Sequence, residues 1–150
     1  MRVEFAGTQT VAAPIKTVWE RLLDADFVAS CAPGVDKVER IDDRHYKLIA
    51  LLGVGSVQLR FAIKLELADL VPPTSARMIV RGNSPGSALS AESSVKLEGN
   101  GAKSTNLEWT VGADIRGTVA STGARLLQGT ARKLTEQFWT TFSKKAPKKG

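Results

Sequence analysis

The segment from Val57 to Leu67 alternates between apolar and polar side chains, and this alternation is the strongest structural constraint in the sequence. Its apolar residues stand at every second position: Val57, Leu59, Phe61, Ile63, Leu65 and Leu67. The positions between them include Gln58, Arg60, Lys64 and Glu66. Successive side chains of a β-strand point to opposite faces of a sheet. The segment is therefore predicted to form a long antiparallel strand with one buried face and one solvated face.

Six further segments show the same two-residue period. They cover residues 3–11, 35–41, 44–52, 76–81, 88–98 and 105–115. Turn-forming residues separate most of them, namely Asp42-Asp43, Pro72-Pro73, the segment from Gly82 to Gly86, and Gly99-Asn100-Gly101. Because strands joined by short turns pair antiparallel, the chain is predicted to form a seven-stranded antiparallel sheet.

Three segments have a helical period instead. Residues 14–23 and 26–32 predict two short helices, with Pro14 in the first turn of the first one. Residues 119–143 predict a long helix whose apolar stripe is Ala120, Gly123, Leu127, Ala131, Leu134, Phe138 and Phe142. Gly129 within it costs about 1 kcal/mol relative to Ala, so we expect a bend or a close packing contact there. The predicted fold class is α+β, a curved sheet with the long helix lying across it.

Length and charge suggest one domain with a basic tail. The chain has 150 residues and a net charge of +6, and four of its lysines lie in the last seven residues. Without them the net charge is +2. We therefore expect a domain over residues 1–143 and a flexible tail over residues 144–150. The tail suits solvent, an acidic partner or anionic lipid; no groove-reading motif or aromatic platform accompanies it, so no nucleic-acid partner is predicted.

The residue types that carry catalysis are sparse. His45 is the only histidine and Cys31 the only cysteine, so neither a His/Cys metal site nor a disulfide is predicted. We expect His45 on the solvated face of a strand and Cys31 as a small buried side chain. Gly53-Val54-Gly55 lacks the third glycine and the following helix of a nucleotide-binding loop. We therefore predict neither a catalytic centre nor a cofactor.

The inner face of the predicted sheet leaves two interpretations open. It mixes large residues such as Phe61 and Trp109 with small ones such as Ala50 and Ala91. Such a face forms either a densely packed core or the lining of a cavity for an apolar ligand. The sequence also has no secretory signal pattern at its N-terminus and no apolar stretch long enough to span a bilayer, which predicts a cytoplasmic protein.

A set of short motifs distributed over residues 3–142 resembles one known family. They are Phe5-Ala6-Gly7, Val11, Ala13-Pro14, Val18-Trp19, Leu22-Leu23, Asp26, Cys31-Ala32-Pro33-Gly34, Gly53-Val54-Gly55, the segments 82–86 and 105–111, Arg116-Gly117-Thr118-Val119-Ala120, Gly123, Leu134 and Phe138. The block at residues 31–34, with its upstream Val-Trp pair, is the most specific. This pattern resembles the carbon monoxide dehydrogenase G-subunit family, within the START/polyketide-cyclase-like superfamily. The resemblance implies the helix-grip fold, in which a curved sheet holds a long C-terminal helix.

The resemblance also implies a function. It suggests a non-enzymatic accessory protein that serves a molybdenum-containing hydroxylase of the carbon monoxide dehydrogenase type and carries a hydrophobic ligand, such as a quinone or another lipid. Many members of that family have a C-terminal membrane-binding extension. This chain ends at Gly150 without one, so we expect at most a weak, reversible contact with the inner face of an anionic membrane. A recruitment or assembly module without a ligand is the alternative, and a small hydrolase or cyclase is a third hypothesis.

Three groups of residues are predicted to carry this function. The ligand-binding residues are Leu48, Leu59, Phe61, Met78, Val80, Leu89, Ala91, Trp109, Val111, Leu127 and Ala131. The cavity mouth is predicted at Cys31, Pro33, Gly34, Gly82, Pro85 and Gly86. Contact with a membrane or partner is predicted at Phe138, Trp139, Phe142, Lys144, Lys145, Lys148 and Lys149.

Overall fold

The computed structural model describes residues 1–54 and 57–147, and its elements follow the predicted order. The chain begins with β1 (Arg2–Val11), α1 (Ile15–Leu22) and α2 (Ala25–Cys31). The next strands are β2 (Val35–Arg40), β3 (His45–Val54), β4 (Val57–Val71), β5 (Ser75–Ser84), β6 (Ser87–Gly99) and β7 (Thr105–Gly117). A short 3-10 helix, η1 (Thr118–Thr122), and the long helix α3 (Ala124–Lys145) follow β7.

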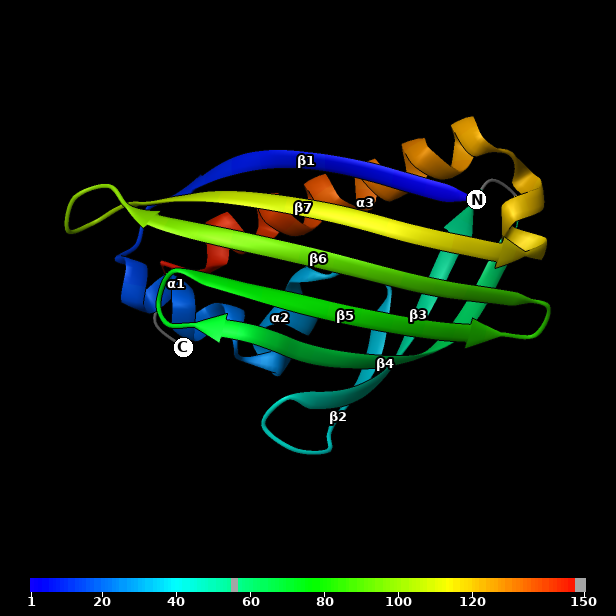
Figure 1. Ribbon diagram of the computed structural model, residues 1–150, viewed down its shortest axis with the longest axis horizontal. Coiled ribbons are helices and arrows are strands. Elements are labelled where there is room, and N and C mark those ends of the chain that lie inside the picture. Colours follow the sequence, from blue (N-terminus) through cyan, green and yellow to red (C-terminus); the bar gives the residue numbers. More distant parts are fainter. Residues whose placement is uncertain (55–56, 148–150) are drawn as a thin grey trace.

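The seven strands of the described chain form one antiparallel sheet in the order β1-β7-β6-β5-β4-β3-β2. The strands before and after α1 and α2 in the chain, β1 and β2, therefore lie at opposite edges. Figure 1 shows α3 crossing behind the sheet, with α1 and α2 near its C-terminal end. The predicted α+β fold, with a long helix across one face of a curved seven-stranded sheet, is confirmed.

The alternation in β4 has the predicted consequence for burial. Phe61 and Ile63 are 2% and 8% exposed, whereas Arg60 and Lys64 are exposed to solvent. Successive side chains of a strand point to opposite faces of the sheet, and only one face of this sheet is covered by helices. The polar residues of β4 thus keep their hydration while the apolar residues face α3.

Two separate clusters of buried side chains hold the helices to the sheet. The first, here called the aromatic cluster, joins α1, α2 and the C-terminal half of α3 to the sheet and contains Trp19, Trp109, Trp139 and Phe142. Trp109 and Trp139 stack with ring centroids 6.3 Å apart, and Phe27 meets Phe142 edge-on at 5.5 Å. The second, here called the aliphatic cluster, lies under η1 and the first turns of α3 and consists of Val3, Ala50, Phe61, Ile63, Ala113, Ile115, Val119 and Leu127.

The long helix differs from the prediction at both ends. Residues 119–143 were expected to form one helix, but η1 and α3 are separated at Gly123, whose φ is +104°. A residue with positive φ cannot continue a right-handed helix, so the continuous helix from Val119 is wrong. At its other end α3 continues past Ser143 to Lys145. In the described part of the chain, no helix combines the length and hydropathy that crossing a bilayer requires.

Candidate functional site

The register of the sheet decides which side chains share its inner face, the face toward α3. Residues directly opposite each other on paired strands point to the same side. One row of such residues crosses six strands and consists of Tyr46, Leu65, Val80, Ala91, Ala113 and Val3. A neighbouring row consists of Leu67, Met78, Ser93, Val111 and Phe5. A third row consists of Val38, Leu48, Ile63, Gly82, Leu89 and Ile115.

These rows bring the predicted ligand-binding residues of the strands to the same face. In a densely packed interior, side chains on such a face are buried. Only Phe61, Trp109 and Leu127 of the predicted set are buried. The other eight are half-buried: Leu48, Leu59, Met78, Val80, Leu89, Ala91, Val111 and Ala131. Each of the eight keeps part of its surface exposed, although all except Met78 pack against one of the two buried clusters.

The position of α3 explains this partial coverage. The helix packs mainly against β1, at the edge of the sheet, and touches β3 more lightly. Its two buried clusters lie toward opposite ends of the helix, and Met78 and Leu134 belong to neither cluster. Met78 on β5 and Leu134 on α3 are both half-buried. The central strands therefore present an apolar surface that α3 leaves partly uncovered.

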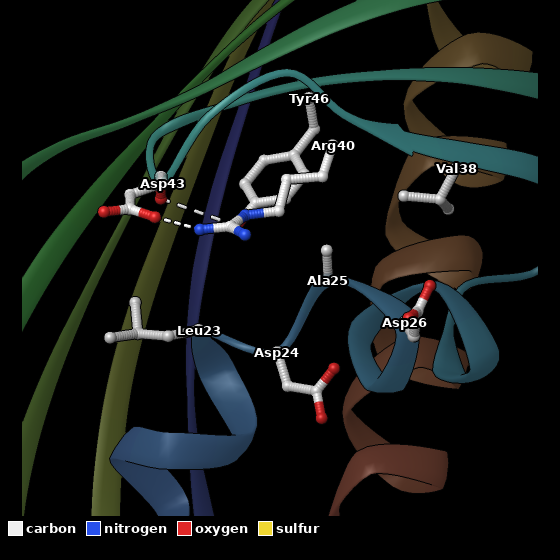
Figure 2. A pocket seen from close by; sticks show the side chains of 8 residues that line it. All are labelled: Leu23, Asp24, Ala25, Asp26, Val38, Arg40, Asp43 and Tyr46. Carbon is white, nitrogen blue, oxygen red and sulfur yellow. Dashed lines mark hydrogen bonds and ion pairs between the residues drawn. The ribbon is translucent and has the colours of Figure 1, made fainter.

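A hollow of about 500 Å³ lies between the α1–α2 link and the β2–β3 hairpin. We call it the hairpin hollow. One wall is Leu23, Asp24, Ala25 and Asp26, and the other is Val38, Arg40, Asp43 and Tyr46. Figure 2 shows these eight side chains around the opening. Its two walls meet because the α1–α2 link folds against the β2–β3 hairpin.

Local hydrogen bonds shape both walls. Asp24 accepts a hydrogen bond from the Phe27 amide at 3.2 Å and so caps the N-terminus of α2. In the hairpin turn, Asp42 accepts from the Arg44 amide at 2.8 Å. That hydrogen bond, with the His45 side chain 2.8 Å away, lowers the pKa of Asp42 below its ordinary value. These contacts hold the link and the turn in the geometry that leaves the hollow between them.

The hairpin hollow shares two lining residues, Val38 and Tyr46, with the rows of the inner face. Arg40 pairs with Tyr46, and Tyr46 begins the row that leads through Val80 and Ala91. Val38 begins the row that contains Leu48 and Leu89. Tyr46 is 7% exposed, so its ring belongs to the interior although its edge lines the hollow. The hollow and the inner face therefore share Val38 and Tyr46, whereas none of the eight half-buried residues lines the hollow.

The polar groups of the hollow lie at its rim. Arg40 forms an ion pair with Asp43, and the Tyr46 hydroxyl donates to the Asp43 carbonyl oxygen at 3.5 Å, as Figure 2 shows. Asp24 and Asp26 stand on the opposite wall and are exposed. The lining thus combines four charged side chains with Leu23, Ala25, Val38 and Tyr46.

The two segments predicted as the mouth pack against different elements. Gly34 has a φ of +82° and lies against the Leu51 backbone, whose amide donates to its carbonyl at 2.8 Å. Gly86 accepts from the Thr118 amide at 2.8 Å, so the β5–β6 turn is fixed to η1. Gly82 is buried in the sheet, Cys31 is buried in the aromatic cluster, and Pro33 and Pro85 are exposed. None of these six residues lines the hairpin hollow.

The residues predicted to contact a membrane or partner fall into two sets. Trp139 and Phe142 are 6% and 0% exposed, so their side chains pack in the interior, whereas Phe138 is half-buried. Lys144 is exposed, and the Lys145 ammonium donates to the Ser30 hydroxyl at 2.7 Å. Lys148 and Lys149 lie outside the described residues. Lys144 and Lys145 belong to the last turn of α3.

The candidate nucleophile and base lie apart. His45 is exposed beside Asp42 and Glu66, at 2.8 and 3.8 Å, and it points away from the inner face because its neighbour Tyr46 points inward. Cys31 is 3% exposed in the aromatic cluster, and burial raises the pKa of its thiol. Of the glycine motif, Gly53 and Val54 end β3, and Gly55 lies outside the described residues. Within residues 1–54 and 57–147, His, Cys, Asp and Glu side chains form no group of three suited to a metal ion.

Sequence reasoning missed the polar rim of the hairpin hollow. The sequence assigns Asp43 to a turn and gives no site role to Asp24, Asp26 or Arg40. A signal existed for Arg40, because it stands two positions after Val38 and so shares the inward phase of β2. No comparable signal existed for Asp24 and Asp26, which reach the rim only because the α1–α2 link folds over the hairpin.

A second, more open hollow of about 630 Å³ lies on α3 away from the sheet. It is lined by Gly123, Ala124, Arg125, Leu126, Gly129, Thr130 and Lys133. Leu126 is 45% exposed, and a Cβ placed on Gly129 would meet no other atom within 4 Å among the described residues. Neither a bend nor a close contact therefore accounts for Gly129. The charged side chains of this hollow are both basic.

Comparison with solved structures places the fold among known proteins. A conserved protein from Geobacillus kaustophilus is 26% identical, with 96% of this chain and 95% of that chain covered and a TM-score of 0.88. A START superfamily protein from Mycobacterium smegmatis is 13% identical over 95% and 96% of the two chains, with a TM-score of 0.70. The Zhui aromatase/cyclase from Streptomyces sp. R1128 is 18% identical over 97% and 94%, with a TM-score of 0.69. The last two share the helix-grip fold alone.

The sequence comparisons identify the family. No protein of curated function matches this sequence. The family model of the carbon monoxide dehydrogenase G subunit, CoxG, matches residues 7–147, which include all the helices and nearly all of the sheet. The fold, the order of elements and this match agree, and the chain belongs to the carbon monoxide dehydrogenase G-subunit (CoxG) family.

Proposed function

We propose that this protein binds a hydrophobic small molecule on the inner face of its sheet, with the hairpin hollow as the mouth of the site. The half-burial of eight inward-facing apolar residues carries this proposal. Each leaves apolar surface in contact with water, and covering such surface is worth roughly 25 cal/mol per Å². An apolar ligand that covers the exposed part of these residues would gain this free energy.

We further propose that the protein is an accessory component without catalytic activity. It would supply its ligand, a quinone or another lipid, to a molybdenum hydroxylase of the carbon monoxide dehydrogenase type. Family membership supports this partner. The separation of Cys31 from His45 supports the absence of catalysis, because a nucleophile requires its base within hydrogen-bonding distance. Among polar side chains, Ser93 on the inner face is already bonded to the Thr110 carbonyl at 2.8 Å.

A blocking substitution tests the ligand site. Ala91 is small, half-buried and central in the row from Tyr46, so Ala91→Phe should occupy the space of the ligand. We expect quinone binding, followed by quenching of tryptophan fluorescence, to be lost while the free energy of unfolding changes by less than about 1 kcal/mol. In a fully packed core, the same substitution would cost about 1–3 kcal/mol.

Ala62→Phe is the matched control. Ala62 lies on β4 and is exposed, so the added ring enters solvent and quinone binding should persist. Native mass spectrometry of the purified protein, with lipids extracted from the same sample, provides an independent measurement. The proposal fails if quinones and other lipids do not bind, or if Ala91→Phe unfolds the protein and leaves binding in the surviving fraction intact.

A recruitment module is the second candidate, and the hollow on α3 favours it. Arg125 and Lys133 flank the exposed Leu126 there, an arrangement that suits an acidic surface with an apolar projection. In this case Arg125→Glu with Lys133→Glu should abolish co-purification with a carbon monoxide dehydrogenase-type enzyme, whereas Ala91→Phe should not. Retained co-purification of the charge-reversed variant would exclude this surface.

A further inference from the structure

The rim of the hairpin hollow has an unbalanced charge. Three carboxylates line it, those of Asp24, Asp26 and Asp43, and a single guanidinium, that of Arg40. The Arg40 charge is already paired with Asp43. Among the described residues no ion pair involves Asp24 or Asp26, so the wall formed by the α1–α2 link is negative. A molecule bound in the hollow would therefore lie near these two carboxylates.

The most buried polar side chain that lines the hollow, that of Tyr46, is a hydrogen-bond donor. Tyr46 is 7% exposed, and among the described residues its hydroxyl bonds only to the Asp43 carbonyl, at the long distance of 3.5 Å. Typical O–H···O hydrogen bonds are 2.7–2.8 Å long, so this contact leaves most of the donor's capacity unused. A ligand atom with a lone pair could replace the carbonyl at a better distance. Figure 2 shows the Tyr46 ring on the hairpin wall of the hollow, beside the Arg40 side chain.

We infer that the site selects an amphiphile whose head group is uncharged and accepts a hydrogen bond, and that it discriminates against anionic head groups. The inference rests on the proposed function, because it assumes that the apolar part of the ligand lies on the inner face. Tyr46 requires an acceptor, which an ammonium group lacks. Asp24 and Asp26 repel the acceptors that carry a negative charge, such as carboxylates and phosphates. Ketone, ester, ether and alcohol heads satisfy both conditions.

Three probes with the same alkyl chain test the inference. They are methyl dodecanoate, dodecanoate and dodecyltrimethylammonium, each titrated into the full chain below its aggregation concentration at neutral pH. Tryptophan fluorescence or calorimetry gives the dissociation constants. We expect the ester to bind several-fold more tightly than the carboxylate. This preference should shrink as salt is added, because the two carboxylates are exposed and thus screened.

Charge-neutralising variants identify the residues responsible. Asp24→Asn with Asp26→Asn should strengthen dodecanoate binding several-fold and leave the affinity for the ester unchanged. Asparagine caps helices as well as aspartate does, so α2 keeps its N-cap in this variant, and Asp26→Asn alone provides a second test. Glu98→Gln with Glu108→Gln removes the same charge from exposed positions of β6 and β7 and should change neither affinity. Tyr46→Phe should lower the affinity for the ester and leave the affinity for the ammonium probe unchanged.

The outcomes separate the inference from the proposed function. Equal or tighter binding of dodecanoate relative to the ester, or an unchanged dodecanoate affinity in the asparagine variants, would overturn the inference while ligand binding itself stands. Binding of none of the three probes would overturn the proposed function, and the inference with it. Selective binding of the ammonium probe would also overturn the inference, because it would show attraction by the carboxylates without a role for Tyr46.

Discussion

Gly7 illustrates how a single residue position depends on a neighbour far away in the chain. It lies opposite Trp109 on the inner face, and a Cβ at Gly7 would overlap the indole ring. The ring in turn stacks on Trp139 of α3. The absence of a side chain at residue 7 thus allows the aromatic cluster to reach the edge strand.

Two glycine substitutions should therefore have opposite effects. Gly7→Ala forces Trp109 to move and should lower the free energy of unfolding by about 1–3 kcal/mol. Gly129→Ala adds a methyl group to a helix surface with free space around it and should raise stability by up to about 1 kcal/mol. Urea denaturation of the two variants and the wild type measures both effects. Destabilisation by Gly129→Ala would mean that the residue has a packing role that the structure does not contain.

The Cys31 thiol should respond to pH in one direction only. Burial raises its pKa, and the Ser30 hydroxyl and the Lys145 charge oppose this shift. Because the folded state holds the proton more tightly than the unfolded state, this contribution to stability is present below the ordinary thiol pKa and is lost as the pH rises towards the raised pKa. Disulfide-reagent labelling of the native protein should therefore be slow and should accelerate at a higher pH than labelling of the urea-unfolded chain. Matching pH profiles would contradict the burial of Cys31.

At the scale of elements, α2 depends on its N-cap. The helix has seven residues, too few to be stable alone. Its first residues, Ala25 and Asp26, line the hairpin hollow. Asp24 supplies the capping acceptor, and Phe27 anchors the helix to Phe142. The link thus keeps its position through a local cap together with tertiary contacts of α2, such as Phe27 with Phe142 and Ser30 with Lys145.

Substitutions at Asp24 should separate capping from charge. Asp24→Ala removes the hydrogen bond to the Phe27 amide and should cost about 1 kcal/mol of unfolding free energy, whereas Asp24→Asn should cost little. Thermal or urea unfolding of the two variants provides the comparison. An equal loss in both would indicate that the charge, rather than the cap, stabilises the link.

Periodicity in the sequence predicted most elements within a few residues, because alternation and the 3.6-residue period follow from local backbone geometry. The exception was the start of the last helix. Ala120 and Gly123 fit the helical stripe, yet Gly117 and Gly123 both adopt positive φ. Glycine is permitted in either conformation, so only the packing of η1 against Ser87 and Gly86 decides between them.

The whole molecule has an uneven interior. The aromatic cluster is dense where α1, α2 and α3 meet the sheet, whereas the centre of the inner face is only half-covered. Stability and ligand binding thus use different parts of the same surface. Binding regions in general come from the less tightly packed parts of a fold.

Truncations in the two regions should differ accordingly. Phe142 is completely buried, and Phe142→Ala should lower the free energy of unfolding by about 3–5 kcal/mol. Met78 is half-buried, and Met78→Ala should lower the free energy of unfolding by about 1–2 kcal/mol and also lower the affinity for the ligand. Chemical denaturation with and without a quinone measures both quantities. Equal destabilisation by the two variants would show that the centre of the sheet is packed as densely as the aromatic cluster.

The sequence alone determined the strands, the helices, the sidedness of the sheet and the family. Each depends on neighbours within a few residues or on short motifs, and the inward phase of Leu48, Val80 and Ala91 follows directly from strand geometry. The aliphatic and aromatic residues of the inner face were therefore predictable as one set.

Only the tertiary structure decided which of those residues are covered and where the site opens. Trp139 and Phe142 are buried and Met78 is not, because α3 packs along β1 rather than over the central strands. Asp24 and Tyr46 line one hollow although 22 positions separate their numbers, because the α1–α2 link folds against the β2–β3 hairpin. Coverage and proximity depend on the distance between whole elements, and no local pattern in the chain encodes that distance.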